Sequence, residues 1–92
     1  MHFTYPAIVR RKDNLTYKGR FPDLEGAVFE GETLDDALEE ARHVMHTWID
    51  VELEEEDGEL PPVSDAHDLP LREGEFVRNV ALNYRLFDGY DE

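Results

Sequence analysis

The spacing of apolar residues predicts three short strands in the first third of the chain. Residues 2–11 mix aromatic and β-branched side chains, which favour a strand, and Pro6 restricts that strand to a sheet edge or to its beginning at this point. Residues 15–21 alternate aromatic or glycine positions with basic ones, and residues 27–30 form a third short apolar run. Turn-forming residues separate the three segments, so the pattern predicts an antiparallel meander.

An amphipathic helix is predicted over residues 33–56. Thr33 can accept a hydrogen bond from an unpaired amide of the first turn, and Asp36 follows three residues later, as in a capping box. Apolar residues then recur every three or four positions and form one continuous stripe. The stripe consists of Leu34, Ala37, Leu38, Ala41, Val44, Met45, Trp48 and Ile49. The helical signal fades in the acidic run before Gly58, a natural helix stop.

The remaining residues predict a loop over 60–74, a fourth strand over 75–84 and an acidic tail over 85–92, which is either flexible or a strand extension. The resulting order is βββαβ, an α+β fold in a single domain over residues 1–92. Because the helix would act as a crossover connection, we expect the fourth strand to lie parallel to the strand beside it.

One helix can cover only one face of this sheet. We expect some of the large aromatic residues Tyr5, Tyr17 and Phe29 to remain on the uncovered face. An exposed apolar face favours self-association, so the sequence predicts a homodimer or tetramer.

The charge of the chain is large and uneven. The 9 Lys and Arg residues stand against 23 Asp and Glu residues, which gives a net charge of −14, yet residues 1–20 alone carry +4. Such a charge favours rapid association with a basic partner and opposes direct binding to nucleic acid. The absence of cysteine excludes a disulfide framework and fits a cytoplasmic protein. No apolar run approaches the length of a membrane span.

Candidate catalytic and metal-binding residues do not assemble into a recognisable constellation. His43, His46 and Asp50 could share one helix face, as metal ligands do, but no further ligand stands at a diagnostic spacing. Partly exposed structural histidines are therefore the favoured explanation. The middle of the first strand has no acid, and the fourth strand offers Asn79 and Asn83 in place of acids, which opposes a two-metal nuclease site. We therefore expect no enzymatic activity, no metal and no cofactor.

Two further patterns carry weak signals. Ser64, the one serine, has His67 nearby, but adjacency alone does not make a catalytic triad. Basic and aromatic residues also gather in the first hairpin, where they would either contact nucleic acid or neutralise acids of the fold itself. This group consists of Tyr5, Arg10, Arg11, Lys12, Tyr17, Lys18 and Arg20. The overall acidity favours the second explanation.

Three segments together resemble the HicB antitoxin family. They are Phe-Pro-Asp-Leu-Glu-Gly at residues 21–26, the Gly-Glu-Thr-Leu-Asp-Asp-Ala helix start at 31–37, and Leu-Pro-Pro-Val-Ser at 60–64. The similarity covers about residues 5–84. It implies a partial ribonuclease-H-like fold without nuclease activity. It also implies that the protein neutralises a small basic mRNA-cleaving toxin, HicA, by masking its RNA-binding or active face.

The resemblance leaves one alternative function open, which is a solitary homo-oligomeric scaffold or regulatory module without a toxin. Family members often carry a C-terminal DNA-binding segment, and we expect none here because the sequence ends at Glu92. For toxin capture, we predict acids near the second turn and the helix end. These acids are Asp23, Glu25, Glu54, Glu55 and Asp57.

Overall fold

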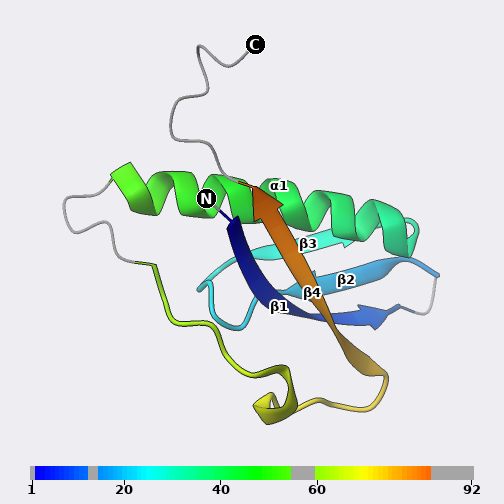
Figure 1. Cartoon of the computed structure of the whole chain (residues 1–92). Coiled ribbons are helices and arrows are strands. Elements are labelled where there is room, and N and C mark those ends of the chain that lie inside the picture. Colours follow the sequence, from blue (N-terminus) through cyan, green and yellow to red (C-terminus); the bar gives the residue numbers. More distant parts are fainter. Residues whose placement is uncertain (1, 13–14, 55–59, 84–92) are drawn as a thin grey trace.

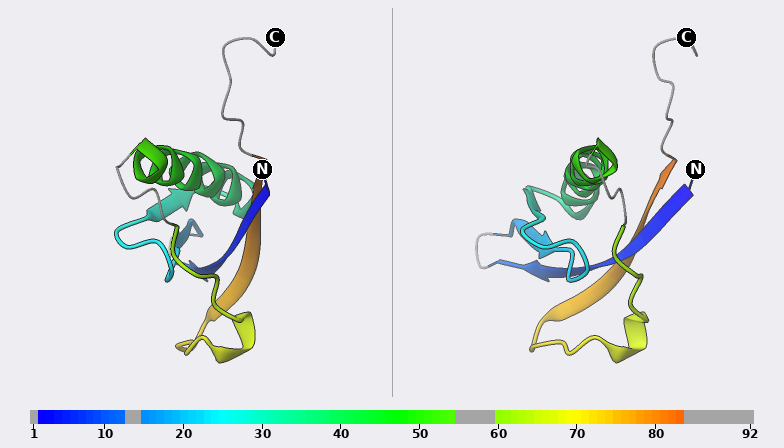
Figure 2. Two further views of the ribbon diagram at one scale, coloured as in Figure 1. Left: turned by 60° about the vertical axis from the view of Figure 1, so that its left-hand side comes forward. Right: turned by 90° about the vertical axis from the view of Figure 1, so that its left-hand side faces the viewer.

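The computed structural model describes residues 2–12, 15–54 and 60–83 (Figure 1). They form a four-stranded sheet and one long helix. The elements are β1 (His2–Arg11), β2 (Tyr17–Arg20), β3 (Val28–Gly31), α1 (Leu34–Glu54), the short 3-10 helix η1 (Ala66–Asp68) and β4 (Glu75–Asn83). The strand order is β3-β2-β1-β4, and α1 and η1 lie on opposite sides of the β1–β4 pair (Figure 2). The predicted α+β class and element order are confirmed.

The prediction of a parallel fourth strand is wrong. β4 pairs with β1 in antiparallel register, from His2 opposite Asn83 to Arg10 opposite Glu75. The helix carries the chain back from the end of β3, as expected, but residues 60–74 then carry it along the sheet a second time (Figure 1). If β4 followed the helix directly, it would begin at the end of the sheet that the helix reaches. Because residues 60–74 cross the sheet first, β4 begins at the other end and runs in the opposite direction, antiparallel to β1.

The start of α1 follows from its capping residue. The backbone N–H of Asp36 donates to Thr33 Oγ1 at 3.0 Å, and the N–H of Ala37 donates to the Thr33 carbonyl at 2.9 Å. The Thr33 hydroxyl therefore satisfies an amide that the helix itself leaves unpaired, and the Thr33 carbonyl accepts the first hydrogen bond of the helix. The predicted helix end at residue 56 and the predicted tail at 85–92 lie outside the described residues.

The core lies between α1 and one face of the sheet. Ala37, Ala41, Met45 and Ile49 are fully buried along the predicted helix stripe. The sheet supplies alternate residues of β1 and one residue each from β3 and β4. Its buried members in the same cluster are Tyr5, Ala7, Val9, Phe29 and Val80.

The three aromatic residues expected on the uncovered face lie on the helix side instead. Tyr5 and Phe29 are buried in the core, and Tyr17 packs against it. The period of a strand tells which residues share a face, but it does not tell which face the helix covers. These residues therefore give no support to self-association, which stays a prediction.

Gly19 of β2 allows β2 and β3 to pack closely. It pairs with Phe29, whose ring lies over the glycine and is 5.5 Å from the Phe21 ring, centroid to centroid. A Cβ atom on residue 19 would overlap the Phe29 ring and lie 2.9 Å from the Ile8 carbonyl oxygen. The ring of Phe29 thus occupies the space that any side chain at position 19 would need.

Candidate functional site

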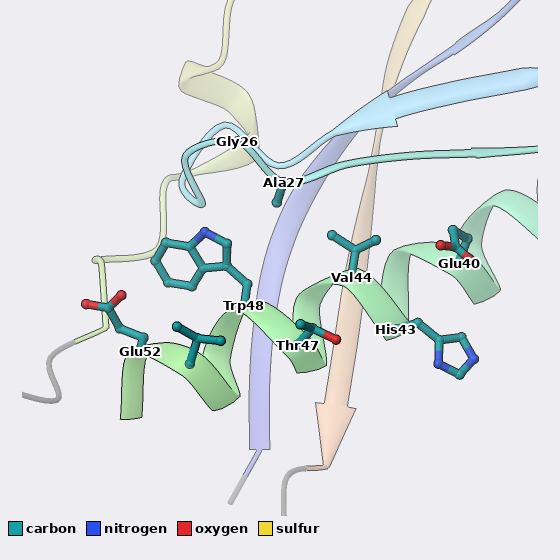
Figure 3. A pocket seen from close by; sticks show the side chains of 9 residues that line it. Gly26, Ala27, Glu40, His43, Val44, Thr47, Trp48 and Glu52 are labelled. Atoms are coloured by element: carbon teal, nitrogen blue, oxygen red, sulfur yellow. The ribbon is translucent and has the colours of Figure 1, made fainter. Parts of the chain in front are cut away.

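An apolar groove of about 480 Å³ lies between α1 and the turn that precedes β3 (Figure 3). Its lining consists of Gly26, Ala27, Glu40, His43, Val44, Thr47, Trp48, Val51 and Glu52. Val51 is 54% exposed, although it is a large apolar residue. Exposed apolar surface next to an open groove is typical of a protein contact site.

The indole of Trp48 forms one wall of the groove. Its N–H donates to the carbonyl oxygen of Glu25 at 3.0 Å, so the ring is held between the helix and the turn. Gly26 follows with a φ of 82°, a conformation that glycine adopts without strain and that reverses the chain at this point. The groove is therefore fixed by a hydrogen bond between two elements rather than by loosely placed side chains.

Carboxylates border the apolar lining. Glu40 and Glu52 lie at opposite ends of the groove (Figure 3), and the exposed Glu25 belongs to the turn beside Trp48. The exposed His43 also borders it, with Nε2 3.9 Å from a carboxylate oxygen of Glu39. An apolar centre with an acidic border suits a partner that presents apolar side chains among basic ones.

Three tertiary hydrogen bonds hold the proline-containing segment, residues 60–64, next to this turn. Both carboxylate oxygens of Asp23 accept from Ser64, one from the backbone N–H at 2.7 Å and one from the hydroxyl at 2.5 Å. The Tyr5 hydroxyl donates to the Pro61 carbonyl at 2.6 Å. Burial raises the pKa of Tyr5, and the nearby charge of Asp23 raises it further. These contacts fix residues 60–64 against β1 and the turn.

Comparison of the sequence with known protein families identifies the family of this chain. The family of HicB-like antitoxins of bacterial toxin–antitoxin systems matches residues 5–82. This chain belongs to the HicB-like antitoxin family. A comparison with curated protein sequences found no match.

Solved structures show the same HicB-like fold. A toxin–antitoxin complex from Streptococcus pneumoniae contains a chain with 28% identity and a TM-score of 0.74, over 90% of this chain and 70% of that one. The HicA3 and HicB3 toxin–antitoxin complex gives 29% identity and a TM-score of 0.65, over 84% and 94% of the two chains. The N-terminal domain of the Burkholderia pseudomallei antitoxin HicB gives 24% identity and a TM-score of 0.73, over 89% and 100%.

The acids predicted for partner binding have different places in this HicB-like domain. Asp23 uses its carboxylate to hold Ser64, whereas Glu25 is exposed beside the groove. Glu54 is exposed at the last position of α1. Glu55 and Asp57 lie outside the described residues. The structure thus brings Glu25 to the groove and gives Asp23 a structural role, and the contact of these acids with a partner stays a prediction.

The other candidate chemistry of the HicB-like chain does not converge on this groove. Within residues 2–12, 15–54 and 60–83, no group of three His, Cys, Asp or Glu side chains is arranged to hold a metal ion. The Ser64 hydroxyl donates to Asp23 rather than to a histidine, and His67 Nδ1 lies 3.3 Å from Asp65. In the same part of the chain, no helix is long and apolar enough to cross a membrane.

Sequence reasoning missed the groove residues as a group. Trp48 and Val44 belong to the predicted apolar stripe, and such a stripe indicates a helix face that packs on the sheet rather than the wall of a groove. Val51 lies beyond that stripe, in a position that helix periodicity leaves exposed. An exposed valine one turn after a tryptophan at the stripe edge is the signal that points to a contact surface.

Replacing Asp23 by alanine should lower the free energy of unfolding by about 1–3 kcal/mol, because the Ser64 N–H and hydroxyl both lose their acceptor in a partly buried site. Ser64→Ala should lower the free energy of unfolding by less, because the backbone N–H of residue 64 still donates to Asp23. Urea unfolding measures both effects, with Glu25→Ala as the exposed acidic control. An Asp23→Ala protein as stable as the Glu25→Ala protein would contradict this structural role.

Proposed function

We propose that this HicB-like chain is an antitoxin that binds a small, basic, mRNA-cleaving toxin of the HicA type and masks its RNA-binding or active face. It would act in the cytoplasm, by binding and not by catalysis. Membership of an antitoxin family supports the role, and two of the similar structures are toxin–antitoxin complexes. The net charge of −14 supports a basic partner.

The apolar groove with its acidic border is the observation that supports one surface of the molecule as the toxin-binding site. A toxin that binds RNA needs cationic side chains for the phosphates, and the same side chains are complementary to Glu25, Glu40 and Glu52. Trp48 and Val51 supply the apolar contacts that give a protein interface its affinity. A partner seated here would place its cationic face against the acids and away from RNA.

Co-expression tests this function directly. The neighbouring reading frame is expected to encode a small basic protein that stops growth when expressed alone and co-purifies with this chain when both are expressed. Restored growth with intact mRNA supports neutralisation. If no basic protein co-purifies and the chain forms a homo-oligomer by light scattering, the scaffold or regulatory alternative holds instead.

Charge reversal at the groove border should slow capture of the toxin. Glu52→Lys is expected to reduce the association rate about tenfold at low salt and to flatten its salt dependence, because it removes attraction for a basic partner. Glu25→Lys and Glu54→Lys should act in the same direction. Stopped-flow or surface plasmon resonance measures the rate.

Asp68→Lys is the matched control for these variants, since it makes the same charge change in η1, on the other side of the β1–β4 pair (Figure 2). Equal slowing by Asp68→Lys and Glu52→Lys would show that only total charge matters, and would remove the groove from the proposal.

A further inference from the structure

A second cavity, of about 310 Å³, lies on the sheet face opposite α1. The alternation of β1 places Ile8 and Arg10 on this face, because Val9 between them belongs to the core under the helix. The chain has nine Lys and Arg residues, and five of them line this one cavity. The five are Arg10, Lys12, Lys18, Arg20 and Arg72. A chain of charge −14 thus gathers most of its cations around one hollow.

Strand register builds the cavity. Arg10 pairs with Lys18, and Ile8 pairs with Arg20, which in turn pairs with Val28. Three neighbouring strands therefore contribute side chains to one patch in which apolar and cationic positions adjoin. The turn that leads into β4 adds Arg72 from the side.

Glu75 contacts two of the three arginine residues that line this cavity. Its side chain is only 4% exposed, and it accepts from Arg20 Nη1 at 3.1 Å and from the backbone N–H of Arg72 at 2.8 Å. The Arg72 N–H, followed by Arg20, lowers the pKa of Glu75 despite its desolvation, so the carboxylate stays charged. This covered carboxylate therefore holds the Arg20 guanidinium and the Arg72 backbone at the wall of the cavity.

The acids nearby do not neutralise the cations. Lys12 pairs with Glu30 at 3.4 Å and Arg20 pairs with Glu75. Neither Arg10 nor Lys18 forms an ion pair with any residue in the described part of the chain. Among the described residues, two carboxylates pair with the five cations of this cavity, and the remaining positive charge would be stabilised by a bound anion.

We propose that this cavity binds the clustered phosphates of a small molecule, of the class of a nucleoside triphosphate. Its volume lies in the range of small-ligand sites. A guanidinium group can donate two parallel hydrogen bonds to phosphate oxygens, and the exposed Val28 offers an apolar surface beside the arginines. Among the residues that the structure describes, none that lines the cavity is aromatic, so these residues offer no surface on which successive bases of a single strand would stack. A small polyanion therefore fits better than a polynucleotide, and this site is independent of toxin capture.

Titration of the purified chain with ATP, inorganic tripolyphosphate and AMP, followed by NMR at low salt, tests the proposal. Triphosphates should shift the amide signals of Arg10, Lys18 and Arg20, and AMP should bind more weakly. Tripolyphosphate binding equal to that of ATP would support recognition of the phosphates alone, and tighter binding of ATP would support a nucleotide.

Arg10→Gln and Lys18→Gln should each weaken triphosphate binding about tenfold. Arg11→Gln is the matched control, because it makes the same change at the next residue of β1, outside the cavity lining. Two variants on different strands keep the test valid if one fails to fold. The proposal is overturned if millimolar triphosphate causes no shifts, if Arg11→Gln weakens binding equally, or if an RNA oligonucleotide binds where triphosphate does not.

Discussion

Val51→Lys is expected to weaken binding of a HicA-type toxin by at least about a hundredfold, the largest loss expected for any single change in the groove. Val51 is exposed beside Trp48 in the apolar lining, so a partner seated there would cover it. A lysine would place a charge in the apolar contact and against a basic partner, and like charges held together in an interface cost several kcal/mol. Surface plasmon resonance or competition binding measures the loss.

Val63→Lys provides the control for this variant. Val63 is 57% exposed, close to the 54% of Val51, but it lies in the proline-containing segment outside the groove lining. Because both side chains are largely in solvent, neither variant should change stability by more than about 0.5 kcal/mol. Toxin binding that survives Val51→Lys, or that falls as far in Val63→Lys, would rule out the groove as the contact surface.

Gly19→Ala should lower the free energy of unfolding by about 3 kcal/mol. The added methyl group would overlap the Phe29 ring and press on the Ile8 carbonyl, and a packed core relieves such overlap only by moving side chains and backbone. That cost is a large share of the total stability of a small domain. Thermal or urea unfolding measures it, with Lys18→Ala as the neighbouring β2 control.

A double-mutant cycle separates this overlap from the intrinsic preference of glycine. Phe29→Leu removes the ring that occupies the space above Gly19, so Gly19→Ala should cost about 1 kcal/mol less in the Phe29→Leu background. Strictly additive effects of the two changes would mean that the ring does not create the requirement for glycine.

Local signals predicted the helix well, whereas the placement of β4 needed information from distant residues. The capping geometry of Thr33 and the apolar stripe act within a few residues of each other. The direction of β4 depends instead on where residues 60–74 lead the chain. The Tyr5–Pro61 and Asp23–Ser64 hydrogen bonds fix that path, and they join residues 56 and 41 positions apart. The spacing of residue types along the sequence does not reveal which distant residues form such hydrogen bonds, so it could not predict the direction of β4.

The sequence predicted the acidic charge of the candidate site, but it did not predict the groove. Composition indicated an acidic surface for a basic partner. Only the hydrogen bond from Trp48 to the Glu25 carbonyl shows that the tryptophan forms the wall of a groove and is more than core. In the same way, the sequence shows the basic residues of the first hairpin, but it does not show that Glu75 of β4, 55 positions further along the chain, pairs with Arg20 of that hairpin. Both surfaces arise where separate elements meet.

The pairing of β1 with β4 ties the first strand to the last one. Residues 2–10 meet residues 75–83, so one side of β1 stays unpaired until nearly the whole domain has left the ribosome. Contacts between distant parts of a chain slow folding, because the intervening segment must be ordered first. A domain of this design completes its sheet only after residues 75–83 have been synthesised, and a truncated product that ends before Glu75 would carry an open strand edge that favours aggregation.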